Sequence, residues 1–243
     1  MGSDARLGAS KYTWSMAHGH SVDDYLEVIY FLAFPVGEYA PVVRGNRAVA
    51  ARVAEMLGVS RASAGEMIKR LEADGLIDRG EHKELMLTDK GRVEAERVMR
   101  RHRLIELLLT EFMGYTPAES HEHADVLGDS FTDDMIDRIE DRLGRPARCP
   151  HGWPIDPDLE MTENKELVSL QELEAGDRAT IIRLAEHDGQ LLHWFYDHGL
   201  EPGVDIEIEA TEPAADQLIL TIGDAEQSVT QKAASGLFVR RAD

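Results

Sequence analysis

The chain has 243 residues and carries 46 acidic against 26 basic side chains, a formal net charge of −20 at pH 7. Its hydrophobic content of 43% suffices for buried cores and excludes a wholly disordered protein. No apolar run is long enough to span a membrane and no apolar signal segment begins the chain, so we expect a cytoplasmic protein. The single cysteine, Cys149, excludes an internal disulfide and a thiolate zinc site, so any metal is expected on histidines and carboxylates.

The charge is unevenly distributed along the chain. Residues 1–92 carry 12 basic and 13 acidic side chains, residues 93–148 carry 8 and 13, and residues 149–243 carry 6 and 20. Only the first part could approach a polyanion at low electrostatic cost. Residues 1–20 are small and polar, and we expect them to form a flexible arm.

Residues 21–92 are predicted to form a winged helix. A first helix begins at Ser21, a typical N-cap, and two further helices are separated by the Gly58-Val59 step, which indicates a helix-turn-helix. A short hairpin with a turn at Gly80 follows and forms the wing. The predicted helices cover 21–33, 47–57 and 60–74, and the predicted strands cover 76–79 and 85–88.

Residues 93–148 are predicted to form a helical domain. A long helix over 89–113 carries a broad apolar stripe, which indicates a buried or dimer-forming helix. Helices over 117–127 and 132–143 follow. A cluster of prolines and glycines then marks a domain boundary, and we expect 149–167 to be an acidic linker.

Residues 168–243 change character and are predicted to form a small β-barrel. Short apolar segments alternate with turn residues, and one helix over 190–198 interrupts them. The predicted strands cover 179–184, 204–210, 218–222, 228–230 and 237–240.

The third predicted helix is the candidate DNA-recognition helix. Its first turn places small polar and basic side chains where a major groove is read, and basic residues further along could contact phosphates. Glu66 on the same helix repels phosphate unless it accepts a hydrogen bond from a cytosine amine. The alternative is a helical bundle with ordinary polar residues on its surface. The candidate DNA-binding residues are Arg47, Ser60, Arg61, Ser63, Lys69 and Arg70.

Histidines and carboxylates recur at helical spacing on three predicted helices. Residues three or four apart on a helix share a face, so each helix presents a stripe of potential ligands. Where such stripes converge, oxygen and nitrogen donors bind one or two divalent cations. For any single pair, a solvated acidic face is the simpler explanation. The candidate ligands are Asp24, Glu27, His102, Glu106, His121, Asp125 and Asp129.

Several stretches, taken in order, carry a resemblance that covers about residues 21–240. They are 24–30 (DYLEVIY), 51–55 (ARVAE), 71–77 (LEADGLI), 87–92 (LTDKGR), 101–104 (RHRL), 121–124 (HEHA) and 149–152 (CPHG). In this order and spacing the chain resembles the diphtheria-toxin-repressor family, in its full-length form with three parts.

The resemblance implies a homodimeric transcriptional repressor that is activated by a divalent metal and binds double-stranded operator DNA. Its implied fold is mainly α, with a winged helix-turn-helix and a helical dimerisation and metal-binding domain, plus a small C-terminal SH3-like β-barrel similar to FeoA. The family's manganese-sensing members carry ligands that match Asp24, Glu27 and His102. Its ancillary site matches His102, Glu106 and His121.

The chain departs from the family pattern at the principal metal site. Asp125 stands where the family has a cysteine or glutamate, and Gly128 and Asp129 stand where it has a glutamate and a histidine. We therefore expect a rearranged site that draws on both ligand sets. The iron-sensing branch takes two further ligands from the barrel, and the residues near those positions are Glu186, Asp188 and Gln190.

Mainly carboxylate donors favour Mn²⁺, with Fe²⁺ as the second candidate. We expect a repressor of metal-uptake genes in which the cation draws the first, long and His121 helices together and fixes the angle of the recognition helices. One alternative is a winged-helix regulator that no longer responds to metal. A metalloenzyme is the other, although the chain has neither a His-Glu-x-x-His motif nor a phosphate-binding loop.

Overall fold

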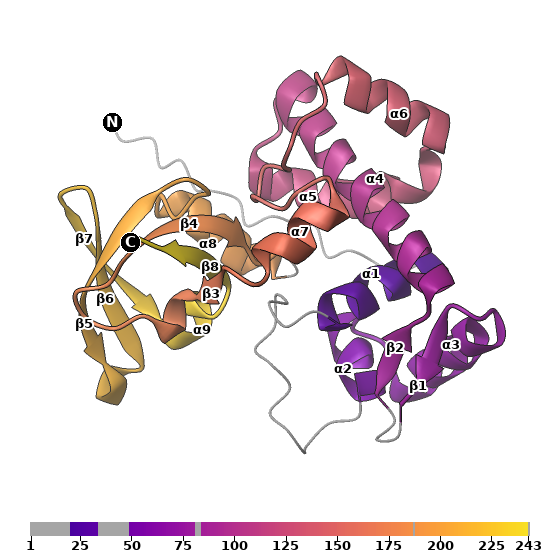
Figure 1. The fold of residues 1–243 in the computed structure, drawn as a ribbon, viewed down its shortest axis with the longest axis horizontal. Coiled ribbons are helices and arrows are strands. Elements are labelled where there is room, and N and C mark those ends of the chain that lie inside the picture. Colours follow the sequence, from indigo (N-terminus) through magenta and orange to yellow (C-terminus); the bar gives the residue numbers. More distant parts are fainter. Residues whose placement is uncertain (1–19, 34–48, 81–83, 187, 243) are drawn as a thin grey trace, which may run out of the picture.

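The computed structural model describes residues 20–33, 49–80, 84–186 and 188–242, and Figure 1 shows their arrangement. The predicted arm, apart from its last residue, and Arg47 lie outside the described residues. A winged helix lies at one end of the molecule and a sheet domain at the other. A helical domain built on one long helix follows the winged helix in the chain and precedes the sheet domain.

The predicted winged helix is confirmed. Ser60 caps the recognition helix, because its hydroxyl accepts a hydrogen bond from the amide of Ser63 at 3.0 Å. Leu26, Ile68 and Leu71 from two helices are at most 1% exposed and form the local core. The elements are α1 (Val22–Ala33), α2 (Val49–Met56), α3 (Arg61–Ala73) and the antiparallel strands β1 (Ile77–Arg79) and β2 (Leu85–Leu87).

The long helix α4 (Asp89–Met113) leaves the wing directly and organises the middle of the molecule. A Cβ at Gly91 would lie 1.8 Å from the carbonyl oxygen of Leu76, so only glycine allows α4 to pack this closely on the wing. Helix α1 packs on α4 together with α5 (Pro117–Leu127) and α6 (Asp133–Arg142). This arrangement places one face of the winged helix against the helical domain.

The segment 149–167, which the sequence predicts to be a linker, is instead packed between the helical domain and the sheet. It contains the helix α7 (Pro157–Glu163), and Trp153 within it is 1% exposed. Its acidic character does not reflect solvent exposure, since Glu160 is 1% exposed and pairs with Arg103 of α4 at 2.6 Å. The sequence does not distinguish a solvated acidic residue from a buried one whose arginine partner is distant along the chain.

The C-terminal domain is an antiparallel sheet with strand order β3-β8-β4-β5-β6-β7 in the described part of the chain. Its predicted strands and the helix α8 (Gly189–Asp197) are present, while β3 and the short α9 (Gln231–Ala234) were not predicted. None of the helices in the described ranges has the length and apolar character that a membrane span requires. The strands are β3 (Val168–Ser169), β4 (Arg178–Leu184), β5 (Asp205–Glu212), β6 (Gln217–Ile222), β7 (Ala225–Thr230) and β8 (Leu237–Arg241).

Candidate metal centre

Four buried side chains from different parts of the fold converge on one point. His102 and Glu106 lie one turn apart on α4, His121 lies on α5 and Glu186 follows β4, and their ligand atoms lie within 4.8 Å of one another. Oε1 of Glu106 is 2.9 Å from Nε2 of His102 and 3.0 Å from Nδ1 of His121. The two ring nitrogens are 3.0 Å apart. We call these four residues the buried cluster.

A third imidazole, that of His151, faces the buried cluster from the segment before α7. Its ring is fully buried, and its Nε2 lies 3.3 Å from Oε1 of Glu106. Tyr196 on α8 donates its hydroxyl hydrogen to the carbonyl of Pro150 at 3.0 Å, so its oxygen, 2.9 Å away, accepts from Nδ1–H of His151. Nδ1 is therefore occupied by this hydrogen bond, and Nε2 is the ring nitrogen that faces Glu106.

The thiol of Cys149 also lies against the buried cluster. Its Sγ is 3.5 Å from Oε1 of Glu186, and the residue is buried. Burial, followed by the negative charges of Glu106 and Glu186, raises the pKa of this thiol well above its ordinary value. A bound cation would reverse this preference and hold the sulfur as a thiolate.

Protons take the place of a cation in the metal-free cluster. Burial disfavours the charged ring of His102, but the charges of Glu106 and Glu27 outweigh it and raise the pKa of His102 well above its ordinary value. Burial acts the same way on His121, where Asp125 and Glu106 outweigh it and raise the pKa to about 9. The pKa of Glu106 lies well below its ordinary value because His151 and His102 outweigh the effect of burial. Glu106 is thus a carboxylate among positively charged rings.

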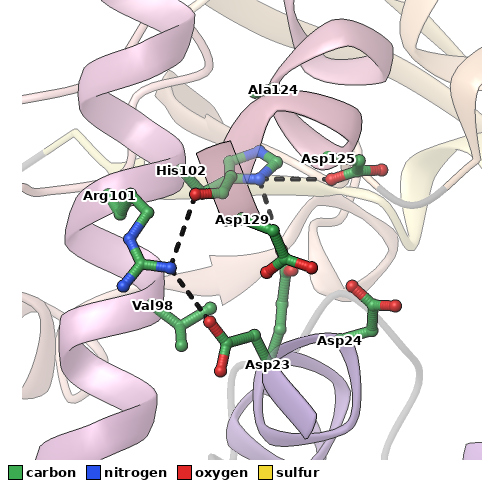
Figure 2. Close-up of a pocket in the computed structure, with 10 residues that line it drawn as sticks. Asp23, Asp24, Val98, Arg101, His102, Ala124, Asp125 and Asp129 are labelled. Atoms are coloured by element: carbon green, nitrogen blue, oxygen red, sulfur yellow. Dashed lines mark hydrogen bonds and ion pairs between the residues drawn. The ribbon is translucent and has the colours of Figure 1, made fainter. Parts of the chain in front are cut away.

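A second group of ligand atoms lies beside the buried cluster, in a pocket shown in Figure 2. Nδ1 of His102 is 3.2 Å from Oδ1 of Asp125 and 3.7 Å from Oε1 of Glu27. The side chain of Asp125 is 50% exposed, so this group is open to solvent where the buried cluster is not. The pocket is lined by Asp23, Asp24, Glu27, Val98, Arg101, His102, Ala124, Asp125, Gly128 and Asp129.

Negative charge exceeds positive charge in the pocket. Five carboxylates and one arginine line it, and this arginine, Arg101, pairs with Asp23 at 2.9 Å (Figure 2). Burial, with the charge of Asp125 adding to it, raises the pKa of Glu27 to about 7 despite the opposing charge of His102. Burial and the charges of Asp23 and Asp24 likewise raise the pKa of Asp129. A divalent cation would compensate these charges.

The predicted metal ligands lie in these two groups or in the lining of the pocket. His102 belongs to both, since its two ring nitrogens face opposite sides. Asp24 and Asp129 line the pocket without joining either set of converging ligand atoms, and Asp24 accepts a hydrogen bond from the amide of Ser21 at 2.9 Å. The buried cluster contains Glu106 and His121, and the pocket group contains Glu27 and Asp125.

Sequence reasoning gave no metal-binding role to Cys149 and His151, and it left Glu186 as one of three candidates from the barrel. The structure brings all three to the buried cluster. The spacing of Cys149 and His151 matches none of the usual metal-ligand spacings, so no local signal marked them. The position of Glu186 depends on how the sheet domain docks, which no local pattern encodes.

The residues present fit a divalent cation. Ligand atoms that share one cation with bonds of about 2.1 Å lie roughly 3 Å apart, which is the spacing among Glu106, His102 and His121. Oε2 of Glu106 and Oε1 of Glu27 are buried and have no hydrogen-bond partner among the described residues. Mixed oxygen and nitrogen donors suit borderline cations such as Mn²⁺ and Fe²⁺.

We expect the metal affinity of the chelator-treated protein to rise between about pH 6 and pH 9, because ligands must lose their protons to bind a cation. The groups concerned are Glu27, with a pKa of about 7, and His121, with a pKa of about 9. Both pKa values are raised in the folded protein, so these groups stabilise the metal-free fold below their pKa values and lose that contribution as the pH rises through them. Calorimetric titration with Mn²⁺ across this range measures the effect, and an affinity independent of pH would contradict it.

The candidate DNA-binding residues that the structure describes lie on the exposed face of α3 or at its start. Arg61 and Ser63 are exposed, while the hydroxyl of Ser60 is engaged in capping the helix. Lys69 pairs with Glu66 at 2.7 Å, and both side chains are more than half exposed. Arg70 lies 3.8 Å from Asp74 and is 65% exposed. These basic side chains are held only by surface ion pairs, which exchange readily for phosphate contacts.

Comparisons with known families match almost the whole chain in three consecutive pieces. Residues 19–85 match the N-terminal DNA-binding domain of iron-dependent repressors, and residues 88–157 match the metal-binding and dimerisation domain of the same proteins. Residues 168–241 match the FeoA domain.

Individual proteins agree with these matches. The chain is 31% identical over 203 residues to the iron-dependent repressor IdeR of Mycobacterium leprae, covering 79% of this chain and 88% of that protein. Among solved structures, a manganese-dependent transcriptional repressor in complex with manganese superposes with a TM-score of 0.74 at 29% identity, over 91% of this chain and 100% of the other. The repressor ScaR with bound Cd²⁺ gives a TM-score of 0.76 at 27% identity, over 92% and 100%.

Proposed function

The chain belongs to the iron-dependent repressor family of metal-dependent transcriptional repressors, and on that premise we propose that Mn²⁺ is its activating ion and Fe²⁺ the main competitor. The oxygen-rich pocket favours the harder cation of the two. We further propose that the active form is a homodimer that binds a palindromic operator and silences genes for metal uptake.

The observation that carries this proposal is the convergence at Glu106. One of its carboxylate oxygens lies within 2.9 to 3.3 Å of nitrogens from His102, His121 and His151, which come from three separate segments of the chain. A purely structural polar core would pair its buried atoms internally, yet Oε2 of Glu106 and Nε2 of His151 lack hydrogen-bond partners in the described chain. A cation bound here would supply the partner that these buried atoms lack.

The ligand positions explain how a cation would act on DNA binding. Glu27 lies on α1 of the winged helix, His102 and Glu106 lie on α4, and Glu186 lies in the sheet domain. The positive charge of a bound cation would hold these elements together, so it would favour one orientation of the winged helix over others. The operator affinity then rises by the ratio of the cation's affinities for the two arrangements.

The test is DNA binding with and without metal. Operators are first selected from random duplex DNA in the presence of Mn²⁺, and binding is then measured by fluorescence anisotropy after chelation and after readdition of Mn²⁺, or of Fe²⁺ without oxygen. We expect binding to disappear on chelation and to return with the ion. Equal binding in both conditions would support the metal-independent alternative. Membership of the family favours neither that alternative nor a metalloenzyme.

The recognition helix offers a prediction about sequence specificity. We expect Arg61→Ala to weaken binding to all DNA sequences roughly equally, because an arginine at the start of α3 is placed to contact phosphates, which carry no sequence information. Glu66→Gln should change the preferred base at one position from cytosine to adenine, since the carboxylate accepts from the cytosine amine and the amide pairs with adenine. Repeating the selection with each variant measures both effects. An unchanged operator for Glu66→Gln would show that Glu66 reads no base.

The proposed dimer uses the end of α4. Phe112 and Met113 are 62% and 60% exposed there, so two large apolar side chains lie side by side on the surface. A second copy of the chain on this face would bury them. Replacing both by serine should yield monomers in sedimentation analysis with unchanged metal binding per chain, whereas an unaltered dimer would place the interface elsewhere.

A further inference from the structure

One apolar core extends from the winged helix into the sheet domain. Phe31 on α1 and Phe238 on β8 belong to the same continuous group of buried side chains, whereas most buried apolar residues of the sheet form a separate core. Trp153 lies between the two phenylalanines and is 1% exposed. Its ring centre is 5.4 Å from that of Phe31 and 6.1 Å from that of Phe238, and both pairs meet edge to face. The segment before α7 therefore joins the DNA-binding domain to the sheet through one side chain.

The ring of Trp153 is held on several sides. Its Nε1–H donates a hydrogen bond to the carbonyl of Leu184 at 2.8 Å. The guanidinium carbons of Arg103 on α4 and Arg183 on β4 lie 5.5 Å and 4.9 Å from the ring centre. Each of these arginines is also paired with a carboxylate of α7. A closely packed ring of this kind does not yield to its neighbours, so a shift of the sheet is passed on to α1.

The winged helix is oriented here as a bound cation would favour. Oε1 of Glu27 on α1 lies 3.7 Å from Nδ1 of His102 on α4, and these two residues and Asp125 have ligand atoms within 4.8 Å of one another. A cation that activates DNA binding selects the arrangement in which its ligands converge. This orientation is therefore the DNA-competent one, and any contact that holds α1 in it adds to the operator affinity.

Building on the proposed function, we propose that Trp153 is a positioning residue for DNA binding. It couples the docking of the sheet domain to the orientation of α1, and it raises the operator affinity without binding metal itself. The bound cation and the docked sheet domain then favour the same arrangement through separate contacts. A protein whose sheet domain is loosely docked binds the operator more weakly even at saturating metal, because fewer molecules are in the competent arrangement.

The test uses the full-length protein at saturating Mn²⁺, with saturation checked by calorimetry for each variant. Binding to the operator selected above is measured by fluorescence anisotropy. We expect Trp153→Leu to lower the operator affinity roughly tenfold, because it removes two edge-to-face aromatic pairs. Phe238→Leu removes the pair on the sheet side only and should lower the affinity roughly threefold. Trp153→Phe keeps an aromatic ring between the two phenylalanines and should recover most of the affinity.

A combined variant shows whether Trp153 carries the coupling. Once Trp153 is replaced by leucine, Phe238→Leu should have no further effect on the operator affinity, because the two changes interrupt the same contact. Phe195→Leu is the matched control, since Phe195 is a fully buried aromatic residue of the sheet domain that belongs to the separate core. Its operator affinity should equal that of the wild type, although urea unfolding should show a loss of stability.

The outcomes separate this proposal from the proposed function. Equal or higher operator affinity in Trp153→Leu would overturn the positioning role, and so would an equal loss of affinity in Phe195→Leu or additive effects in the combined variant. None of these results changes the requirement of the wild-type protein for metal. Wild-type operator binding that persists after chelation would instead overturn the proposed function.

Discussion

Glu106→Gln is expected to lower the affinity of the buried cluster for metal by at least about 100-fold, since loss of an orienting partner alone has effects of 10–100-fold. Glu106 is fully buried, and its carboxylate is the group to which the three histidines converge. Glutamine keeps the shape of the side chain and removes its charge, so a cation bound by the histidines would lose its carboxylate ligand. Metal-dependent operator binding should disappear with the metal affinity.

Calorimetric titration with Mn²⁺ and the anisotropy experiment measure these two losses. Glu111→Gln is the matched control, because Glu111 lies on the same helix but is exposed. Circular dichroism of the metal-free variant should match the wild type, which separates loss of ligand from loss of fold. Operator binding that still depends on metal in Glu106→Gln, at wild-type metal concentrations, would exclude the buried cluster as the site that activates DNA binding.

Arg103→Met is expected to lower the free energy of unfolding by about 3–5 kcal/mol, the usual effect of leaving one member of a buried ion pair without its partner. Arg103 is 1% exposed, donates to Glu160 at 2.6 Å and to the carbonyl of Pro154 at 2.6 Å, and lies over the ring of Trp153. The variant leaves the carboxylate of Glu160 buried without this cation. The contact between α4 and α7 should weaken first.

Urea unfolding of the metal-free protein measures this loss. Arg138→Met is the control, because Arg138 pairs with Asp134 on the exposed face of α6 and its replacement should have no measurable effect. The double variant Arg103→Met and Glu160→Met should recover most of the stability, since it removes both charges and keeps the volume. A loss below about 1 kcal/mol in the single variant would show that water already reaches Glu160.

Local patterns in the sequence determined the secondary structure and much of the site. The spacing of apolar residues and the caps at Thr88 and Gly114 define α4 without reference to any other element. The same helical spacing puts His102 and Glu106 on one face, so their shared role was predictable. The winged helix and the exposed basic face of α3 followed from similar short-range rules.

Tertiary structure alone decided which ligands complete the buried cluster. His151 and Glu186 lie far from His102 in the sequence, and they reach it because the segment 149–167 is packed against α4 and carries the sheet domain with it. The acidic residues of that segment predict a solvated linker, because their arginine partners are not near them in the sequence. Glu160 and its partner Arg103 are more than 50 residues apart. Docking of this kind depends on the summed complementarity of two surfaces, and no short pattern of residues encodes such a sum.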